Sequence, residues 1–346
     1  MSRSRFTLSA LAASLTGATL LASTLSHADD TRIRFQLDWR FEGPAAPFLM
    51  AVERGYFEEE GLEVEVDSGS GSAGAINRVA SGAYEMGFGD LNALVEFLAE
   101  NPDGPGIKGV YVVYDGTPAA VFARKDRDIE SPEDLEGKTL AAPSFDTGYR
   151  AWGIFAEANG IDPESVEWQN VDPSLRETLL QRGDADAITG FYFTSLINLE
   201  SRGMSEEELT IMPFSEYGVP LYGNAIMVSD AFAEENPEAV KGFLRAFNRA
   251  LEETLADPDA AVEYVKNRDA LIDVEMETRR LQLAIDSVIA TEDARANGAG
   301  AVDEERLAQS IQAVADAYAL SSVPEVDDVF DSRFLPPQED RMIFPE

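Results

Sequence analysis

The chain has 346 residues, 64 acidic side chains against 27 basic ones, a formal net charge of −37 at pH 7, and no cysteine. This excess of negative charge repels phosphate, so it excludes nucleic acids and disfavours anionic membrane surfaces as partners. Disulfides are excluded, and His27 is the one histidine, so little of the usual nucleophilic, acid–base and metal chemistry is available. Composition therefore favours a binding protein over an enzyme, with no metal or cofactor.

Residues 1–28 have the features of a secretory signal peptide. Arg3 and Arg5 form a basic start, residues 6–25 are mainly apolar, and residues 26–28 (Ser-His-Ala) match a small-x-small cleavage site. Removal of this leader takes the formal charge from −37 to −39 and leaves about 318 residues, a length suited to two domains. No cysteine follows the cleavage site, so no lipid anchor is expected there. These features predict a freely soluble periplasmic protein.

The first part of the expected mature chain alternates between strand and helix patterns. Strands are expected at 32–37, 62–67 and 85–90, and helices at 48–60, 74–81 and 91–100. A Gly/Ser turn at 68–74 precedes the second of these helices. Strands that alternate with helices predict a parallel sheet with crossover helices.

Two apolar, β-rich segments are expected to cross between two lobes. The first, at 109–125, surrounds Asp115-Gly116-Thr117-Pro118, and the second, at 221–229, returns. Between them, residues 185–193 predict a strand that runs into an aromatic loop. Further helices are expected at 147–159, 173–182, 237–255, 258–267, 274–290 and 303–318.

This order predicts an α/β fold with two lobes, two strand crossings and a helical C-terminal region. Lobe I is expected to comprise residues 29–115 and 224–346, and lobe II residues 116–223. Ligand sites in such folds lie where strand ends and helix N-termini face a cleft.

Five segments occur in an order that is typical of a known family. They are QLDW (36–39), GYFEEEGLEVEV (55–66), SGSGSAGAINRVASGAYEMGFGD (68–90), SPEDLEGKTLAAP (131–143) and NPEAVKGFLRAF (236–247). Together they resemble the periplasmic substrate-binding proteins of ABC importers, in the branch for thiamine pyrimidine precursors, with relatives for taurine, alkanesulfonates and nitrate. The resemblance implies a type II periplasmic-binding fold that closes by a hinge around a small molecule. It also implies a membrane permease and its ATPase as partners, and we expect the protein itself to be a monomer.

The resemblance places the end of the first strand in the cleft. Leu37, Asp38 and Trp39 match an LDW segment that lies at the cleft in the pyrimidine-precursor branch. An indole face can stack on a flat heteroaromatic ring, and a carboxylate can accept hydrogen bonds from an exocyclic amine. A capping aspartate and a core tryptophan are the alternative reading. Residues 40–43 depart from the family's usual continuation, which leaves the exact ligand open.

Two helix starts in lobe I are further candidates. Ser70, Gly71 and Ser72 precede a helix whose free N–H groups favour an anionic group, although the same residues can simply cap the helix. Asp90 and Asn92 stand at the next helix start, where Asp90 fits a cap better than a ligand contact.

The remaining candidates come from lobe II and the return strand. They are Phe145, Asp146, Thr147 and Tyr149 in a strand-to-helix loop, Phe191 and Tyr192 in a turn that resembles the aromatic turn over the ligand in relatives, and Tyr222 and Asn224. Asp146 or Thr147 can also cap a helix, and the last two residues can contact ligand or only form the hinge. We expect Trp39 and one aromatic of that turn to sandwich a ring.

Two other functions remain as alternatives. A binding protein for a small anion would rely on the helix N-termini, whereas the supply of aromatic residues favours a flat heterocycle. Eukaryotic members of the fold synthesise the thiamine pyrimidine with a histidine and a Cys-rich iron motif, and the expected mature chain has neither. The sequence therefore predicts a binding protein that does no chemistry.

Overall fold

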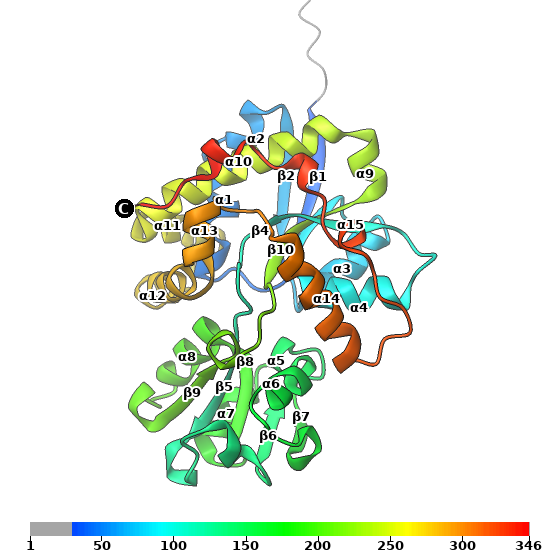
Figure 1. Cartoon of the computed structure of the whole chain (residues 1–346). Coiled ribbons are helices and arrows are strands. Elements are labelled where there is room, and N and C mark those ends of the chain that lie inside the picture. The colour runs from blue at the N-terminus through cyan, green and yellow to red at the C-terminus, as the bar shows by residue number, and fades with distance from the viewer. Residues whose placement is uncertain (1–29, 346) are drawn as a thin grey trace, which may run out of the picture.

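The computed structural model describes residues 30–345, so the predicted signal peptide at 1–28 lies outside the described residues. Two α/β bodies lie one above the other in Figure 1, and two extended segments join them. Lobe I contains β1 (Thr31–Gln36), α1 (Ala46–Glu53), α2 (Tyr56–Glu59), β2 (Leu62–Asp67), α3 (Ser72–Ala80), β3 (Met86–Asp90), α4 (Leu91–Glu100), β4 (Ile107–Val112) and β10 (Asn224–Ser229). Lobe II contains β5 (Ala119–Arg124), β6 (Thr139–Ala142), α5 (Thr147–Arg150), α6 (Trp152–Ala158), β7 (Glu167–Asn170), α7 (Arg176–Arg182), β8 (Ala187–Phe191), α8 (Tyr192–Ser201) and β9 (Leu209–Pro213).

Each lobe is built on a five-stranded mixed sheet, with the orders β2-β1-β3-β10-β4 and β7-β6-β8-β5-β9. The predicted parallel arrangement holds for β1 with β2 and β3, and for β6 with β7 and β8. It is wrong for β10 and β5, which run antiparallel to their neighbours. The chain enters β5 and β10 directly from the other lobe. Each of these strands therefore begins at the edge of its sheet that faces the other lobe, where the parallel strands end.

The two crossings are paired segments, residues 113–118 and 221–223. The Thr117 N–H donates to the Leu221 carbonyl at 2.9 Å, and the Gly223 N–H donates to the Tyr114 carbonyl at 3.0 Å. The strand expected over 109–125 is therefore interrupted, and it becomes β4 and β5 on either side of the crossing. The expected lobe boundaries at 115/116 and 223/224 stay a prediction, and both fall at this hinge.

Several helix predictions need correction in detail. The helix expected over 48–60 breaks between α1 and α2, where Gly55 adopts φ +72°. The helix expected over 147–159 is α5 and α6, with a break at Ala151. The aromatic loop expected after β8 is wrong, because α8 begins at Tyr192, directly after the last residue of the strand.

The C-terminal region supplies helices to both flanks of the hinge. It comprises α9 (Asp230–Glu235), α10 (Pro237–Ala256), α11 (Pro258–Arg268), α12 (Val274–Ala284), a π-helical turn (Ile285–Ile289), α13 (Glu292–Asn297), α14 (Glu304–Ala317) and α15 (Val326–Val329). Helix α12 contacts α8 of lobe II, and α14 contacts both α4 of lobe I and α6 of lobe II (Figure 1). Across residues 30–345, none of the helices combines the length and apolarity needed to span a membrane.

The core of lobe I is a stack of phenylalanine rings between the sheet and α10. Phe35 lies 5.0 Å from both Phe48 and Phe243, centroid to centroid, and Phe48 lies 4.5 Å from Phe247. Rings at these separations add to the free energy gained by burying their area. This packing fixes the end of β1, from which the first candidate site residues project.

Candidate functional site

A cleft lies between the lobes, where the strands of both sheets end. Its outer part is lined by Asp38, Trp39, Gly71, Ser72, Pro143, Phe145, Asp146, Thr147, Pro173, Arg176, Phe191 and Thr194. Its deeper part shares four of these residues and adds others, including Glu42, Phe88, Tyr114 and Phe193.

Hydrogen bonds from the loop after β2 hold the first wall in place. The Gly71 N–H donates to the Asp38 carbonyl at 2.6 Å, and the Gly69 N–H donates to the Trp39 carbonyl at 2.8 Å. Gly69 is required for this approach, because a Cβ there would lie 2.0 Å from the Leu37 carbonyl oxygen. The start of α3 is thereby held beside the Asp38–Trp39 segment.

Asp38 and Trp39 carry hydrogen-bonding groups that the described residues do not fully satisfy. Asn224 Nδ2 donates to Asp38 Oδ2 at 2.8 Å, and burial raises the pKa of Asp38 to about 7 despite this bond. Asn224 Oδ1 and Trp39 Nε1 are buried, and neither has a partner among residues 30–345. Buried polar atoms are almost always paired, so the Trp39 indole N–H, which lines the cleft, is a candidate for contact with a polar ligand.

Aromatic side chains supply the other surfaces of the cleft. The Phe145 side chain is 46% exposed and lies on the lobe II wall, near Gly71 of lobe I. Phe191 packs against Phe193 with ring centroids 5.9 Å apart, and Phe193 packs edge-on against Tyr114 at 5.7 Å. The Arg40 guanidinium lies 5.3 Å from the Trp39 ring centroid. Aromatic groups from both lobes therefore meet in one small volume.

Two of the helix N-termini near the cleft are capped by carboxylates of the chain itself. Asp90 accepts from the N–H groups of Asn92 and Ala93 at the start of α4, and Asp146 accepts from those of Gly148 and Tyr149 at the start of α5. Burial raises the pKa of Asp90 to about 6, against the opposing effect of these bonds. The third, α3, begins after Gly71 with no side-chain cap.

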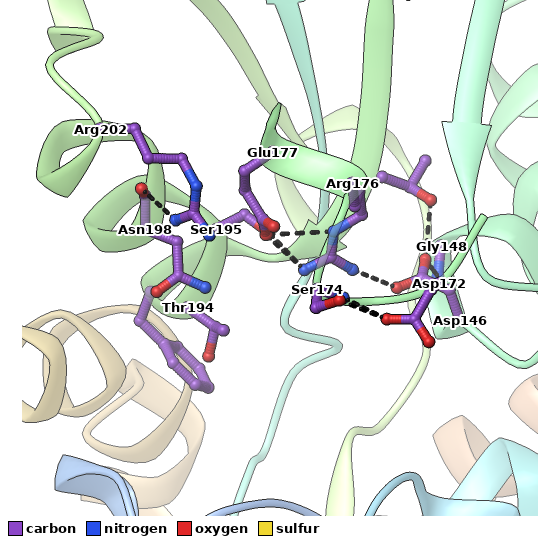
Figure 2. Close-up of polar contacts among 12 residues, drawn as sticks. Asp146, Gly148, Asp172, Ser174, Arg176, Glu177, Thr194, Ser195, Asn198 and Arg202 are labelled. Carbon is purple, nitrogen blue, oxygen red and sulfur yellow. Dashed lines mark hydrogen bonds and ion pairs between the residues drawn. The ribbon is translucent and has the colours of Figure 1, made fainter. Parts of the chain in front are cut away.

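Asp146 also belongs to a buried cluster around Arg176 (Figure 2). Arg176 Nη1 donates to Asp146 Oδ2 at 2.9 Å, and Arg176 Nη2 donates to Glu177 Oε1 at 2.7 Å and to Ser195 Oγ at 2.9 Å. Burial opposes the charge on Glu177, but Arg176 outweighs it, so the pKa of Glu177 is lowered. A Cβ at Gly190 would lie 2.2 Å from Ser195 Oγ, so glycine is needed there.

A second buried guanidinium, that of Arg280, connects the two lobes in the deeper part of the cleft. Arg280 of α12 donates to Glu277 Oε2 at 2.9 Å and to the carbonyl of Thr194 in α8 at 3.0 Å. Its Nε lies 3.6 Å from Glu42 Oε2, and Thr194 Oγ1 lies 3.4 Å from the same oxygen. Burial raises the pKa of Glu42, although Arg280 acts against that rise.

The charges around the cleft do not balance. Seven carboxylates and four guanidinium groups lie in its walls or directly behind them. The carboxylates are those of Asp38, Glu42, Asp90, Glu96, Asp146, Glu177 and Glu277, and the guanidinium groups are those of Arg40, Arg150, Arg176 and Arg280. The local potential is therefore negative, which favours a ligand with N–H donors or positive charge over an anion.

The structure brings most of the predicted site residues together, and it places six of them outside the lining of the cleft. Ser70 is exposed, and Asn92 is buried with its amide donating to the Tyr222 carbonyl. Tyr149 packs against Trp168, Tyr192 packs against a hydrophobic cluster of lobe II, and the Tyr222 hydroxyl accepts from the Asp303 N–H. Asn224 does not line the cleft but positions Asp38.

Sequence analysis missed Arg176, Thr194, Glu42 and Arg280. Arg176 lies inside the helix predicted at 173–182 and opens the observed α7, but nothing in the sequence pattern indicates that it pairs with Asp146. Glu42 lies three residues after Trp39, in the stretch 40–43 that departs from the family's usual residues, and nothing in that stretch indicates a site residue. Arg280 lies far away in the sequence, and only tertiary packing brings α12 to the cleft.

Comparison with known proteins gives a consistent set of similarities. A family model described as NMT1/THI5 like matches residues 44–261. The formylaminopyrimidine-binding protein of Halalkalibacterium halodurans is 30% identical over 236 residues, which cover 67% of this chain and 69% of that protein. The riboflavin-binding protein RibY of Chloroflexus aurantiacus is 26% identical over 297 residues, 84% of this chain and 82% of that protein. A 4-amino-5-hydroxymethyl-2-methylpyrimidine phosphate synthase of Aspergillus parasiticus is 26% identical over 241 residues, 67% of this chain and 69% of that enzyme.

Solved structures with the same architecture confirm the predicted fold class. The periplasmic aliphatic sulphonate binding protein SsuA of Escherichia coli superposes with a TM-score of 0.68 at 13% identity, covering 87% of this chain and 92% of that one. The Candida albicans CA3427 gene product, described as having the generic periplasmic binding protein fold, gives a TM-score of 0.67 at 16% identity, covering 88% and 98%. At these identities the likeness concerns the fold alone.

Proposed function

This chain belongs to the NMT1/THI5-like family, and on that premise we propose that it is the extracytoplasmic solute-binding component of an ABC importer. Its ligand is a small aminated N-heteroaromatic compound of the thiamine pyrimidine precursor class. The observation that carries this proposal is the position of the Asp38 carboxyl among Trp39, Phe145 and Phe191 in one cleft.

The cleft offers each part of such a ligand a matching group. A flat ring fits between aromatic side chains of the two lobes, and the Asp38 carboxylate accepts from an exocyclic amine. The buried Trp39 Nε1–H can donate to a ring nitrogen. The uncapped N-terminus of α3 suits a neutral carbonyl oxygen, such as that of a formyl group.

A small anion such as taurine, an alkanesulfonate or nitrate is the less favoured ligand. The N-termini of α4 and α5 are already occupied by Asp90 and Asp146, and the surrounding carboxylates add repulsion. Arg176, the guanidinium in the lobe II wall, is held by Asp146 and Glu177, so its charge is largely neutralised before any ligand arrives.

The proposed mechanism is a shift of population toward a closed form. Trp39 belongs to lobe I and Phe145 to lobe II, so a ring between them stabilises closure in proportion to its extra contacts. In this structure Thr147 Oγ1 of lobe II lies 3.4 Å from Asp90 Oδ2 of lobe I, and Arg150 pairs with Glu96. Contacts of this kind between the lobes would add to the stability of a closed form. The membrane permease and its ATPase would then accept the solute from a monomeric periplasmic carrier.

We propose a carrier that binds its ligand without converting it, although its relatives include synthases. Three carboxylates of the cleft, those of Asp90, Asp146 and Glu177, are bound to helix N-termini or to Arg176, and the Asp38 carboxyl is the one left to face the ligand. The three bound carboxylates position structure and are poorly placed to move a substrate proton.

Isothermal titration of the purified mature chain tests the proposal. Its panel comprises formylaminopyrimidine, riboflavin, taurine and nitrate, at fixed pH and ionic strength. Saturable binding of formylaminopyrimidine with at least a hundredfold preference over both anions is expected. Preference for an anion would overturn the ligand class, and chromatographic detection of a product after incubation would overturn the carrier role.

A further inference from the structure

A second cavity, of about 320 Å³, lies beside the hinge and shares no lining residue with the ligand cleft. Its walls come from the crossing segments, α13, the loop 298–303 and the C-terminal tail around Gln338 and Arg341. A volume of this size holds several water molecules or one small solute. No step of the proposed transport function uses it.

One end of this cavity carries a buried cation. Arg341 is 7% exposed, and it donates from Nε to the Pro336 carbonyl at 2.9 Å and from Nη1 to the carbonyls of Gly298 and Ala299 at 3.3 and 2.6 Å. Within residues 30–345, Nη2 has no hydrogen-bond partner, and the charge has no carboxylate partner. A guanidinium satisfied only by carbonyls keeps its full positive charge.

The other end carries carboxylates. Asp293 lies in the first turn of α13 and Asp303 caps α14, and both line the cavity. Arg341 is bound at the opposite end of α13, and five residues of helix separate Asp293 from Gly298 by about 7 Å. The third acid of the lining, Asp115, is engaged by Thr291 at 2.6 Å and by Arg306 at 3.2 Å. The same Arg306 guanidinium lies 3.5 Å from Asp293 Oδ2, so one cation faces three carboxylates and this end keeps a net negative charge. The cavity is therefore positive at one end and negative at the other.

We propose that this cavity is a second small-molecule site that binds a short-chain zwitterion. Its carboxylate pairs with Arg341, and its ammonium group lies toward Asp293 and Asp303. A dicarboxylate is repelled at the acidic end and a diamine at the Arg341 end, so the two poles select a molecule with one charge of each sign. Nε and Nη1 of Arg341 are already bound to backbone carbonyls, so a charge-assisted hydrogen bond from Nη2 to the ligand carboxylate provides the orientation at this end.

Three isosteric probes separate the two poles. The purified mature chain is titrated with 4-aminobutyrate, butyrate and butylammonium by calorimetry and by saturation-transfer NMR. We expect 4-aminobutyrate to bind at least tenfold more tightly than either probe that lacks one charge, because each pole contributes charged hydrogen bonds. Equal binding of butylammonium and 4-aminobutyrate, or no saturable binding of 4-aminobutyrate, would overturn the proposal.

Variants locate the site. Arg341→Gln is expected to weaken 4-aminobutyrate binding at least tenfold, whereas Arg333→Gln, on the same tail but with its side chain 80% exposed, leaves the affinity unchanged. Arg341 also ties the tail to residues 298–299, so Ala301→Trp serves as a second variant that fills the cavity from another wall. Retained formylaminopyrimidine binding reports that each variant folds. Wild-type affinity for 4-aminobutyrate in both cavity variants would refute the assignment.

Discussion

Replacing Asp38 with asparagine should make the protein more stable and yet poorer at binding its ligand. The Asp38 carboxyl lies in the cleft wall, where burial raises its pKa to about 7, well above the usual value for an aspartate. Its one side-chain partner among the described residues is the Asn224 amide. Asparagine has nearly the same shape and can keep that contact, but it carries no charge to desolvate.

The sign of the stability change follows from linkage. The folded pKa is raised, so between about pH 4 and pH 7 the native state binds more protons than the unfolded state, and wild-type stability falls as pH rises. Relative to a protein with an uncharged residue 38, this pKa shift lowers the free energy of unfolding by about 4 kcal/mol at pH 8 and about 2 kcal/mol at pH 5. These are upper figures, because Asp38 retains some contact with solvent. Asp38→Asn should therefore be stabilised relative to wild type, and more so at pH 8.

Ligand affinity should move the other way. A charged Asp38 accepts hydrogen bonds from a ligand amine. Removal of that charge in Asp38→Asn should weaken the binding free energy by about 1.5–3 kcal/mol, roughly 10-fold to 150-fold in Kd. For a ligand that does not titrate between pH 5 and pH 8, wild-type affinity should rise with pH as Asp38 loses its proton, while the variant should bind equally at both values.

Urea denaturation and calorimetric titration of both proteins at pH 5 and pH 8 provide the measurements. Asp90 titrates in a similar range, but it is present in both proteins, so its contribution cancels in the difference. An asparagine variant that is less stable than wild type at pH 8 would contradict the reasoning. So would a stability difference that does not change with pH.

Three further predictions concern the walls of the cleft. Trp39→Ala should weaken heterocycle binding at least tenfold and Trp39→Phe by less, as titration would measure, and equal losses would argue against stacking. Arg280→Gln leaves Glu42 and Glu277 buried without their cation, so urea denaturation should show a loss of about 3–5 kcal/mol in the free energy of unfolding. The control Arg279→Gln breaks a partly exposed pair with Glu200 and should lose less than about 1 kcal/mol. Similar losses in the two variants would contradict the assignment of a buried ionic role to Arg280. Gly190→Ala should lower the free energy of unfolding by about 1–3 kcal/mol, because the added methyl group overlaps Ser195. The control Gly74→Ala in α3 has open space around its Cβ and should be neutral or stabilising. A Gly190→Ala variant as stable as wild type would show that the Arg176 cluster can shift.

Sequence analysis located the parts of the site that depend on local structure. A strand followed by Asp38 and Trp39 places those residues at a sheet edge, and Asp90 and Asp146 are recognisable as helix caps because they precede helical periodicity. The two crossings were visible because apolar strand patterns flank turn residues at 115–118. In each case the signal lies within a few residues of the feature that it predicts.

The missed features depend on contacts between distant segments. Arg280 reaches the cleft only because α12 packs against α8, and no periodicity within α12 encodes that neighbour. Tyr222 was a candidate for the cleft, but its ring lies 3.9 Å from the Arg306 guanidinium on another side of the hinge. The antiparallel entry of β5 and β10 likewise follows from the order in which the chain visits the lobes, which strand patterns do not record.

The negative cleft explains how one carboxyl can discriminate among ligands. A charged Asp38 that has Asn224 as its one side-chain donor raises the free energy of the closed form, and Glu42 and Asp90 add to this cost. A ligand amine removes the cost, whereas an anion increases it, so closure is favourable around donors and unfavourable around taurine or nitrate. The same carboxyl that lowers stability therefore supplies specificity, because the energy lost when it is charged and unpaired is regained only when a hydrogen-bond donor enters. On this argument, the net charge within the cleft, more than its volume, determines which solute the two lobes enclose.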